Sequence, residues 1–169
     1  MAGRSAANGG SGVKDLVLRG LTAGDREEAD ALFREAVARA RAGVEGAPLD
    51  AEAHYLLAVA LGYHLEHQGL RQKFALAAEA RREAERALAL APGHAGAHHV
   101  MGRLHAGAMR LNRVARLVLR EVLGASLLEG ASWEQAEQHF RQARAADPAC
   151  PRHAMELGAL YLDTGRPAL

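Results

Sequence analysis

The side chains in this sequence that are best suited to chemistry are its nine histidines. His94, His98 and His105 are spaced by four and seven residues, so a helix would place them on one face together with Met101. Imidazole binds zinc and other transition metals, but such sites also recruit carboxylates or thiolates, and none is expected on this face. His98 and His105 instead occupy large-residue positions that face a partner helix, as His54 does earlier in the chain. We therefore expect structural histidines here.

The other candidate metal ligands are weaker. His64 and His67 flank Glu66, but this set lacks the second acidic or cysteine ligand that would make it specific. Cys150 is the single cysteine, so it has no second thiol with which to form a metal pair or an internal disulfide. We expect no metal and no other cofactor.

The motifs of common catalytic sites are missing from the sequence. None of its serines lies in a G-x-S-x-G elbow: Ser5, Ser11, Ser126 and Ser132. There is no G-x-x-x-x-G-K-[ST] loop, and the glycines near the start follow no strand, so a phosphate cradle is not predicted. We therefore expect that the protein is not an enzyme.

The composition favours an all-α fold. The 169 residues are 49% hydrophobic, which is enough to bury a continuous core. Aromatic residues make up only 4% and alanine dominates the apolar set, which suits closely packed helices better than strands. The formal net charge is +1 with acidic and basic residues interleaved, so nucleic acid is not an expected partner.

The predicted location is the cytoplasm. Residues 1–12 are small and polar, which predicts a flexible N-terminal lead and not a signal peptide. The longest apolar runs fall short of the roughly 20 residues that span a bilayer. A chain with one cysteine is also suited to a reducing compartment.

Three prolines mark an internal repeat: Pro48, Pro92 and Pro148. A large apolar residue followed by a small one comes nine residues after each proline: Leu57-Ala58, Met101-Gly102 and Leu157-Gly158. An alanine comes twelve residues before each proline: Ala36, Ala80 and Ala136. Three matches in one register indicate a repeat of helical units, in which we expect the small residue to lie at a close contact between helices.

This register resembles the tetratricopeptide family, whose pattern is W-x2-L-G-x2-Y, then A-x3-F, then P. The last unit matches best, with Ala136-x3-Phe140, Pro148 and Leu157-Gly158-x2-Tyr161, although Ala154 stands where the family often has a bulky residue. The resemblance implies an all-α solenoid of helical hairpins, an α-α superhelix.

The spacing of the units points to a narrower resemblance. The prolines are 44 and 56 residues apart, more than the family's unit of about 34. The extra residues fall around 63–74 and 110–131, and the second excess predicts an inserted helix over 111–123. With the segments 98–103 and 132–136, such enlarged units resemble the regulator of microtubule dynamics proteins and their bacterial relatives over residues 25–166. The alanine- and arginine-rich composition suggests a bacterial member of the family, for which microtubules are not the natural partner.

Caps and breakers predict the helix boundaries. Asp25 with Glu28, and Ser132 with Gln135, have the spacing of helix starts, and Asp50 opens a further helix. Apart from the inserted helix, the predicted helices cover residues 13–21, 25–42, 50–67, 72–90, 95–109, 132–146 and 152–163. We expect one repeat domain over 13–169, in which the last repeat is incomplete and its uncovered helix either self-associates or frays.

The predicted inserted helix raises the question of membrane binding. It carries Arg110, Arg113, Arg116 and Arg120 among leucines and valines, and basic amphipathic helices can lie on anionic membranes. It lacks the interfacial aromatic residues that membrane anchors usually have. We expect it to pack back on the solenoid, so a membrane is not an expected partner.

In such a solenoid the first helix of each pair lines the concave side. The stripe beside the core positions of these helices is therefore the predicted partner-binding groove: Glu52, Tyr55, Val59 and Tyr63, then His99, Arg103 and Ala106, then Arg152, Met155, Ala159 and Leu162. Arginines can grip carboxylates and tyrosines offer rigid contact area.

The predicted function is therefore a non-catalytic scaffold that binds a protein or peptide in this groove. Two alternatives stay open. One is a self-assembling structural module, and the other is a metal- or membrane-associated accessory domain.

Overall fold

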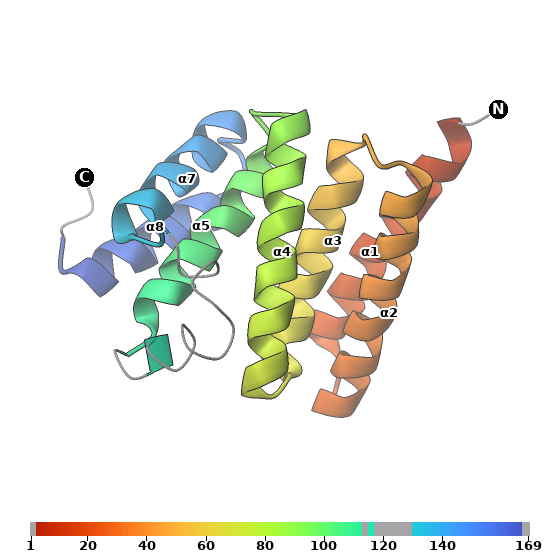
Figure 1. The fold of residues 1–169 in the computed structure, drawn as a ribbon, viewed down its shortest axis with the longest axis horizontal. Helices are drawn as coiled ribbons and strands as arrows, with labels where there is room; N and C mark the ends of the chain where they lie inside the picture. The colour runs from red at the N-terminus through yellow and green to blue at the C-terminus, as the bar shows by residue number, and fades with distance from the viewer. Residues whose placement is uncertain (1–2, 113–114, 117–129, 167–169) are drawn as a thin grey trace. The chain divides into compact units, whose positions relative to one another are not determined.

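The computed structural model of the chain describes residues 3–112, 115–116 and 130–166, with the backbone alone for residues 3–9. In these parts of the chain the secondary structure is helical and contains no strand, which confirms the all-α fold. Figure 1 follows the helices in chain order. Their bounds are α1 Gly3–Thr22, α2 Arg26–Gly46, α3 Ala51–His64, the short 3-10 helix η1 Leu65–His67, α4 Leu70–Leu90, α5 Ala95–Arg110, α7 Trp133–Ala146 and α8 Pro151–Thr164.

Helix starts follow the caps that the sequence predicts. The Asp25 carboxylate accepts a hydrogen bond from the Glu28 backbone N–H at 2.8 Å, and Asp50 accepts one from Glu52 at 3.0 Å. The Ser132 hydroxyl accepts from the Gln135 N–H at 3.1 Å. Each side chain satisfies an N–H group that the first turn of a helix leaves without a partner.

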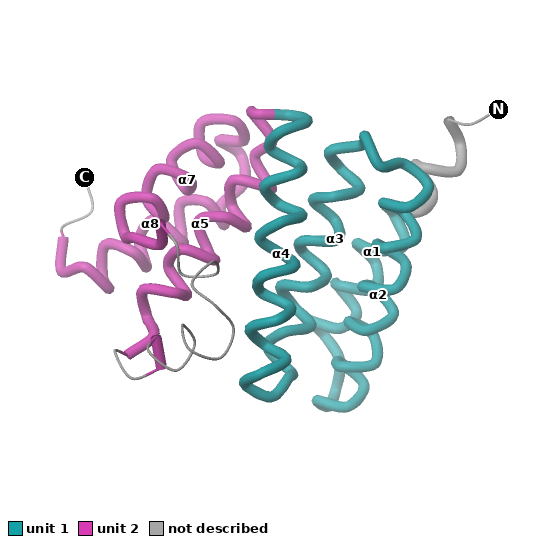
Figure 2. Tube along the Cα trace, in the orientation of Figure 1, with its two compact units in different colours: residues 1–91 teal, residues 92–169 magenta. Residues whose placement is uncertain are grey.

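The chain divides into two compact units, residues 1–91 and 92–169, within the segment for which we expected one repeat domain (Figure 2). In the first unit, α1 packs on α2, α2 on α3, and α3 on α4, so neighbouring helices form hairpins. Their core contains Phe33, Ala36, Leu57 and Leu61, all less than a tenth exposed. The extra residues around 63–74 form η1 and the first turn of α4.

The N-terminal segment differs from the expected flexible lead. Helix α1 begins at Gly3, so residues 3–12 are helical. A Cβ atom on Gly10 would lie 3.2 Å from Leu56 Cδ1, and one on Gly12 would lie 3.2 Å from an Arg39 nitrogen. Glycine in this segment therefore lets α1 lie close to α2 and α3. The same glycines had led us to expect a flexible segment.

In the second unit, α5 packs on α7 and α7 packs on α8. The core is built around Phe140, Leu157 and Leu160, with Ala106 and Ala136 beside them. Helix α8 ends at Thr164. Gly165 stops it as predicted, and its φ of 64° is the left-handed conformation that glycine adopts readily. The predicted inserted helix over 111–123 lies for the most part outside the described residues, so its packing stays a prediction.

Candidate binding surface

Two histidines at equivalent repeat positions act as structural braces. The Nε2 atom of His54 lies 3.0 Å from the Pro48 carbonyl oxygen, and that of His98 lies 2.8 Å from the Pro92 carbonyl oxygen. The Nδ1 atom of His54 contacts a Glu83 carboxylate oxygen at 2.6 Å. Both histidines are buried, which confirms the prediction that they face the core. Each joins the turn before its helix to the side of its hairpin partner.

His98 belongs to a cluster of three imidazoles between α5 and α7. Its Nδ1 atom lies 3.0 Å from Nδ1 of His139, and the His105 ring stacks on His139 with centroids 5.5 Å apart. Burial, with the neighbouring His98 and His105, lowers the pKa of His139 to about 4. His139 is therefore neutral at pH 7, and the cluster acts as packing and hydrogen bonding.

The set around Glu66 is not brought together as a ligand group. His64 lies 3.3 Å from a carboxylate oxygen of Asp30 on α2, and burial lowers its pKa. Glu66 pairs instead with Lys73 at 2.8 Å. These side chains link η1 and the start of α4 to their neighbours.

The predicted groove stripe on α3 is half-buried within the first unit. Glu52 pairs with Lys14 of α1 at 2.8 Å. Tyr63 stacks on the Phe33 ring of α2, with centroids 5.7 Å apart. The half-buried residues of this stripe are Glu52, Tyr55, Val59 and Tyr63, and both tyrosines pack on the core. Helices α1 and α2 therefore contact much of this predicted surface.

The predicted stripe in the second unit is more exposed. Arg103 of α5 and Glu156 of α8 lie 3.6 Å apart, and Arg110 pairs with Asp163 at 2.7 Å, so ion pairs connect the two helices. Arg152 is exposed beside them. Met155 is 70% exposed and Leu162 is 85% exposed, which is high for large apolar side chains.

Two residues of this stripe do not face the exterior as predicted. Ala106 is buried in the core of the second unit, so its assignment to the groove was wrong. His99 points into a contact. It is half-buried, and its Nδ1 atom lies 2.9 Å from Nδ1 of His153. Burial, followed by the neighbouring His153, Arg103 and Arg152, lowers the pKa of His99 to about 4. His99 is thus neutral at pH 7 and is engaged with the first turn of α8.

A hollow between α7 and α8 was not foreseen from the sequence. Its volume is about 450 Å³. It is lined by Arg141, Arg144, Ala145, Pro148, Ala154, Leu157, Gly158 and Tyr161. The pairing of small residues at Ala154 and Gly158, one helical turn apart, is the signal that could have revealed it.

Gly158 corrects an expectation drawn from the repeat. The Leu157-Gly158 pair was expected to mark a close helix contact, as Met101-Gly102 does. A Cβ atom on Gly102 would lie 2.6 Å from the Phe140 ring, so that contact is real. A Cβ atom on Gly158 would meet nothing within 4 Å, because this side of α8 opens into the hollow.

Four residues on this side of α8 form what we call the α8 surface: Ala154, Met155, Gly158 and Leu162. Met155, Gly158 and Leu162 are spaced by three and four residues, and Ala154 lies four residues before Gly158, so all four share one side of the helix. Leu157 and Leu160 occupy the buried face and pack with Phe140. One face of α8 thus builds the core, and another presents small and apolar side chains to the exterior.

The family model of Regulator of microtubule dynamics protein 1-3 matches residues 16–168. The chain belongs to this family. No curated protein matches the chain significantly. The match confirms the narrower resemblance that we inferred from the enlarged units, and it begins within α1, ahead of the expected start at residue 25.

The residues matched by the Regulator of microtubule dynamics protein 1-3 family model include part of α1 and all of the later described helices. The match therefore extends over both units. Within the described residues, none of the helices has the length and hydropathy needed to cross a membrane.

Proposed function

We propose that this family member is a non-catalytic scaffold that binds a protein partner through the α8 surface. The observation that carries the proposal is the exposure of Met155 at 70% and Leu162 at 85% beside the hollow between α7 and α8. Large apolar side chains that cluster in the open are typical of interaction sites. The proposal concerns the second unit, and we expect the protein to act in the cytoplasm.

The shape of the α8 surface favours a helical partner. Ala154 and Gly158 are small, so another helix can approach α8 closely there. Met155 and Leu162 stand to one side of them and offer apolar contact. A partner helix could place one or two apolar side chains in the hollow of about 450 Å³. This is the way in which an amphipathic helix binds in a groove.

The charges around the α8 surface favour acidic residues on the partner. Arg141 and Arg144 lie at the hollow, and Arg103 and Arg152 flank the other side of α8. Arg141 already pairs with Glu137 at 2.7 Å, so it is held in place on α7. Arginines at the rim of an apolar surface steer association with an acidic partner and select its orientation.

The internal repeat supports a tetratricopeptide-like classification, since proteins of that type bind partners on their exposed first helices. Ala58 and Gly102 are buried at the small-residue position, as that register requires. The family's name refers to regulators of microtubule dynamics. A protein partner agrees with that name, while the alanine- and arginine-rich composition favours a bacterial partner in place of microtubules.

Affinity capture with matched variants tests this proposal. Leu162→Asp places a charge on the α8 surface, and Gly158→Leu adds a large side chain on the side of α8 that lines the hollow, where a Cβ atom meets nothing within 4 Å. Both should lose the captured partner and keep wild-type circular dichroism. Leu49→Asp is the control, because Leu49 is 73% exposed but lies in the first unit. Arg103→Glu and Arg152→Glu should weaken capture.

Retention of every captured protein by Leu162→Asp and Gly158→Leu would contradict the proposal. Light scattering separates it from the alternative of a self-assembling module. If the exposed α8 surface mediates self-association, the mass of the wild type rises with concentration, and that of Leu162→Asp does not.

A further inference from the structure

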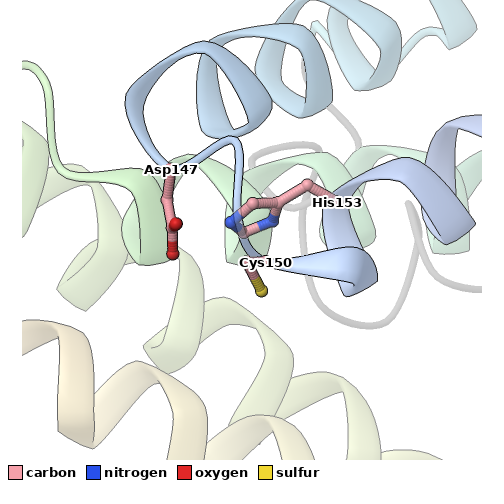
Figure 3. Close-up of side chains that lie close together, drawn as sticks. All are labelled: Asp147, Cys150 and His153. Carbon is pink, nitrogen blue, oxygen red and sulfur yellow. The ribbon is translucent and has the colours of Figure 1, made fainter.

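Three potential metal ligands meet in the turn between α7 and α8. They are Asp147, Cys150 and His153, and their ligand atoms all lie within 4.8 Å of one another. Figure 3 shows the three side chains gathered at this turn, with the Cys150 sulfur below the imidazole of His153 and the Asp147 carboxylate to the left of both. Asp147 is exposed, Cys150 is half-buried and His153 is buried. The group is therefore anchored on the protein at one end and open to solvent at the other.

Comparison with the two equivalent turns shows that these residue types are not required by the repeat. Each turn has three equivalent positions, the residue before its proline and those three and six residues after that one. The first turn has Ala47, Asp50 and Ala53 at these positions, and the second has Ala91, His94 and Ala97. The third turn has Asp147, Cys150 and His153 at these positions. Both alanines of the other turns are thus replaced by residues that bind metals.

The middle position is informative because its usual role is helix capping. Asp50 accepts a hydrogen bond from Glu52 N at 3.0 Å, and His94 Nδ1 accepts one from Ala97 N at 3.1 Å. Cys150 is the cap residue of α8 but makes no side-chain capping bond. The Cys150 thiol therefore stands at a position that is used for helix capping in the other two turns, but it does not cap α8.

The backbone of the turn holds the three residues in fixed relation. Prolines at 148 and 151 restrict φ on both sides of Cys150. The Cys150 N–H donates to the Asp147 carbonyl at 3.4 Å, and the His153 N–H donates to the Cys150 carbonyl at 3.3 Å. A preorganised set of ligands loses little conformational entropy when it binds an ion.

His153 is also oriented from behind in the manner of a metal ligand. It is 4% exposed, and its Nδ1 atom contacts Nδ1 of His99 on α5 at 2.9 Å. Histidines that bind metals commonly use one ring nitrogen for the ion and hold the other in a hydrogen bond to the protein. When His153 donates from Nδ1 to His99, its Nε2 atom carries the lone pair that an ion needs.

We propose that Asp147, Cys150 and His153 bind one divalent transition-metal ion of the zinc type. Thiolate, imidazole and carboxylate are the ligands that zinc uses in proteins, and hard ions such as Mg²⁺ and Ca²⁺ avoid sulfur. Water completes the fourth position on the exposed side of Asp147. One thiolate and one carboxylate balance the double charge of the ion. Cys150 is the N-cap residue of α8, where the helix dipole favours the thiolate.

The geometry needs only small side-chain movements to bind the ion. With metal bonds of about 2.0–2.3 Å, tetrahedral ligand atoms are about 3.3–3.8 Å apart. The present atoms lie within 4.8 Å, so rotations of the exposed Asp147 and half-buried Cys150 side chains can close the set. The bound ion would tie the end of α7 to the start of α8. This proposal does not depend on the proposed partner binding.

Cobalt titration of the metal-free full chain tests the site. Co²⁺ should bind with one equivalent per chain and give a near-ultraviolet thiolate-to-cobalt absorption band, which one equivalent of Zn²⁺ abolishes. Mg²⁺ and Ca²⁺ should have no effect. Absence of the band, or of stoichiometric Zn²⁺ binding in calorimetry, would overturn the proposal.

Three variants make the test specific to these residues. Cys150→Ser should abolish the cobalt band, and it should raise the melting temperature of the metal-free chain because serine can cap α8. Asp147→Ala, which copies the other two turns, should weaken metal binding at least tenfold. His94→Asn keeps a capping residue in the second turn and should bind Co²⁺ as the wild type does. Wild-type cobalt binding in both Cys150→Ser and Asp147→Ala would show that the ion binds elsewhere.

Discussion

At the scale of single residues, two glycines with the same sequence context have opposite roles. Gly102 lies directly under the Phe140 ring, whereas Gly158 faces the hollow. Sequence repetition predicted close contact at both. It could not show which of the two has another helix over it, because that depends on residues distant in the chain.

The two glycines should respond oppositely to alanine. In Gly102→Ala the new Cβ atom would lie 2.6 Å from the Phe140 ring, so overpacking should lower the free energy of unfolding by about 1–3 kcal/mol. Gly158→Ala meets nothing within 4 Å and should raise it by about 0.5–1 kcal/mol through helix propensity. Urea unfolding of the two variants measures both changes, and equal shifts would contradict the packing described here.

The buried imidazole cluster predicts a dependence of stability on pH. The pKa of His139 is about 4 in the folded protein, compared with 6.5 for an ordinary histidine. Between these values the unfolded chain binds a proton that the folded chain does not, so stability falls as the pH drops from 6.5 towards 4. The slope is at most about 1.4 kcal/mol per pH unit, and solvent screening reduces it because His139 is half-buried.

Replacement of this imidazole separates its contribution from that of other groups. His139→Gln cannot titrate, so its unfolding free energy should change less between pH 6.5 and 4 than that of the wild type. The measurement is chemical denaturation at several pH values. The same pH dependence in both proteins would show that His139 does not titrate as its burial indicates.

At the scale of helices, capping residues and prolines gave reliable boundaries. Asp25, Asp50 and Ser132 begin helices as predicted, and each makes the expected capping bond. These signals are local, so they can be found in the sequence. The start of α1 was wrong because glycines were taken as flexible, although they allow close packing in this helix.

Helix α8 has a core face and an exposed face, and we expect substitutions on the core face to lower the free energy of unfolding much more. Leu157 is 4% exposed, so Leu157→Ala should cost about 2–5 kcal/mol in unfolding free energy. Leu162 is 85% exposed on the same helix, and Leu162→Ala should change the stability by less than about 0.5 kcal/mol. Thermal melting monitored by circular dichroism compares the pair. A large loss in Leu162→Ala would mean that the α8 surface is covered in the folded protein.

The candidate sites were harder to predict from sequence than the helices. Met155 and Leu162 are exposed, as their spacing beside the core stripe of α8 led us to expect, and their role in binding stays a prediction. The group at Asp147, Cys150 and His153 was not predicted, because a single cysteine without a second thiol is not a recognised metal motif. Its ligands have three different chemical types and come together only through the fold of the turn. The exposure of a surface likewise depends on which helices cover it.

At the scale of the whole molecule, the chain contains two compact units. The first unit has its own core, in which side chains of α1, α2, α3 and α4 all take part. Valine and leucine residues of α1 contribute to it: Val13, Leu16 and Val17. A unit with a complete core of this kind can fold as one cooperative element.

Residues 1–91 should therefore fold in isolation and unfold in a single cooperative transition. The four helices of this unit bury Phe33 and Leu61 among themselves, so their core does not require residues beyond 91. A fragment of residues 26–91 is the matched control. It lacks α1 and so leaves apolar side chains of α2 and α3 uncovered, which should lower its melting temperature or abolish the transition. Circular dichroism and amide hydrogen exchange on the two fragments decide the question. If residues 1–91 melt without cooperativity, or if loss of α1 leaves their stability unchanged, the first unit is not an independent folding element and α1 is not an integral part of its core.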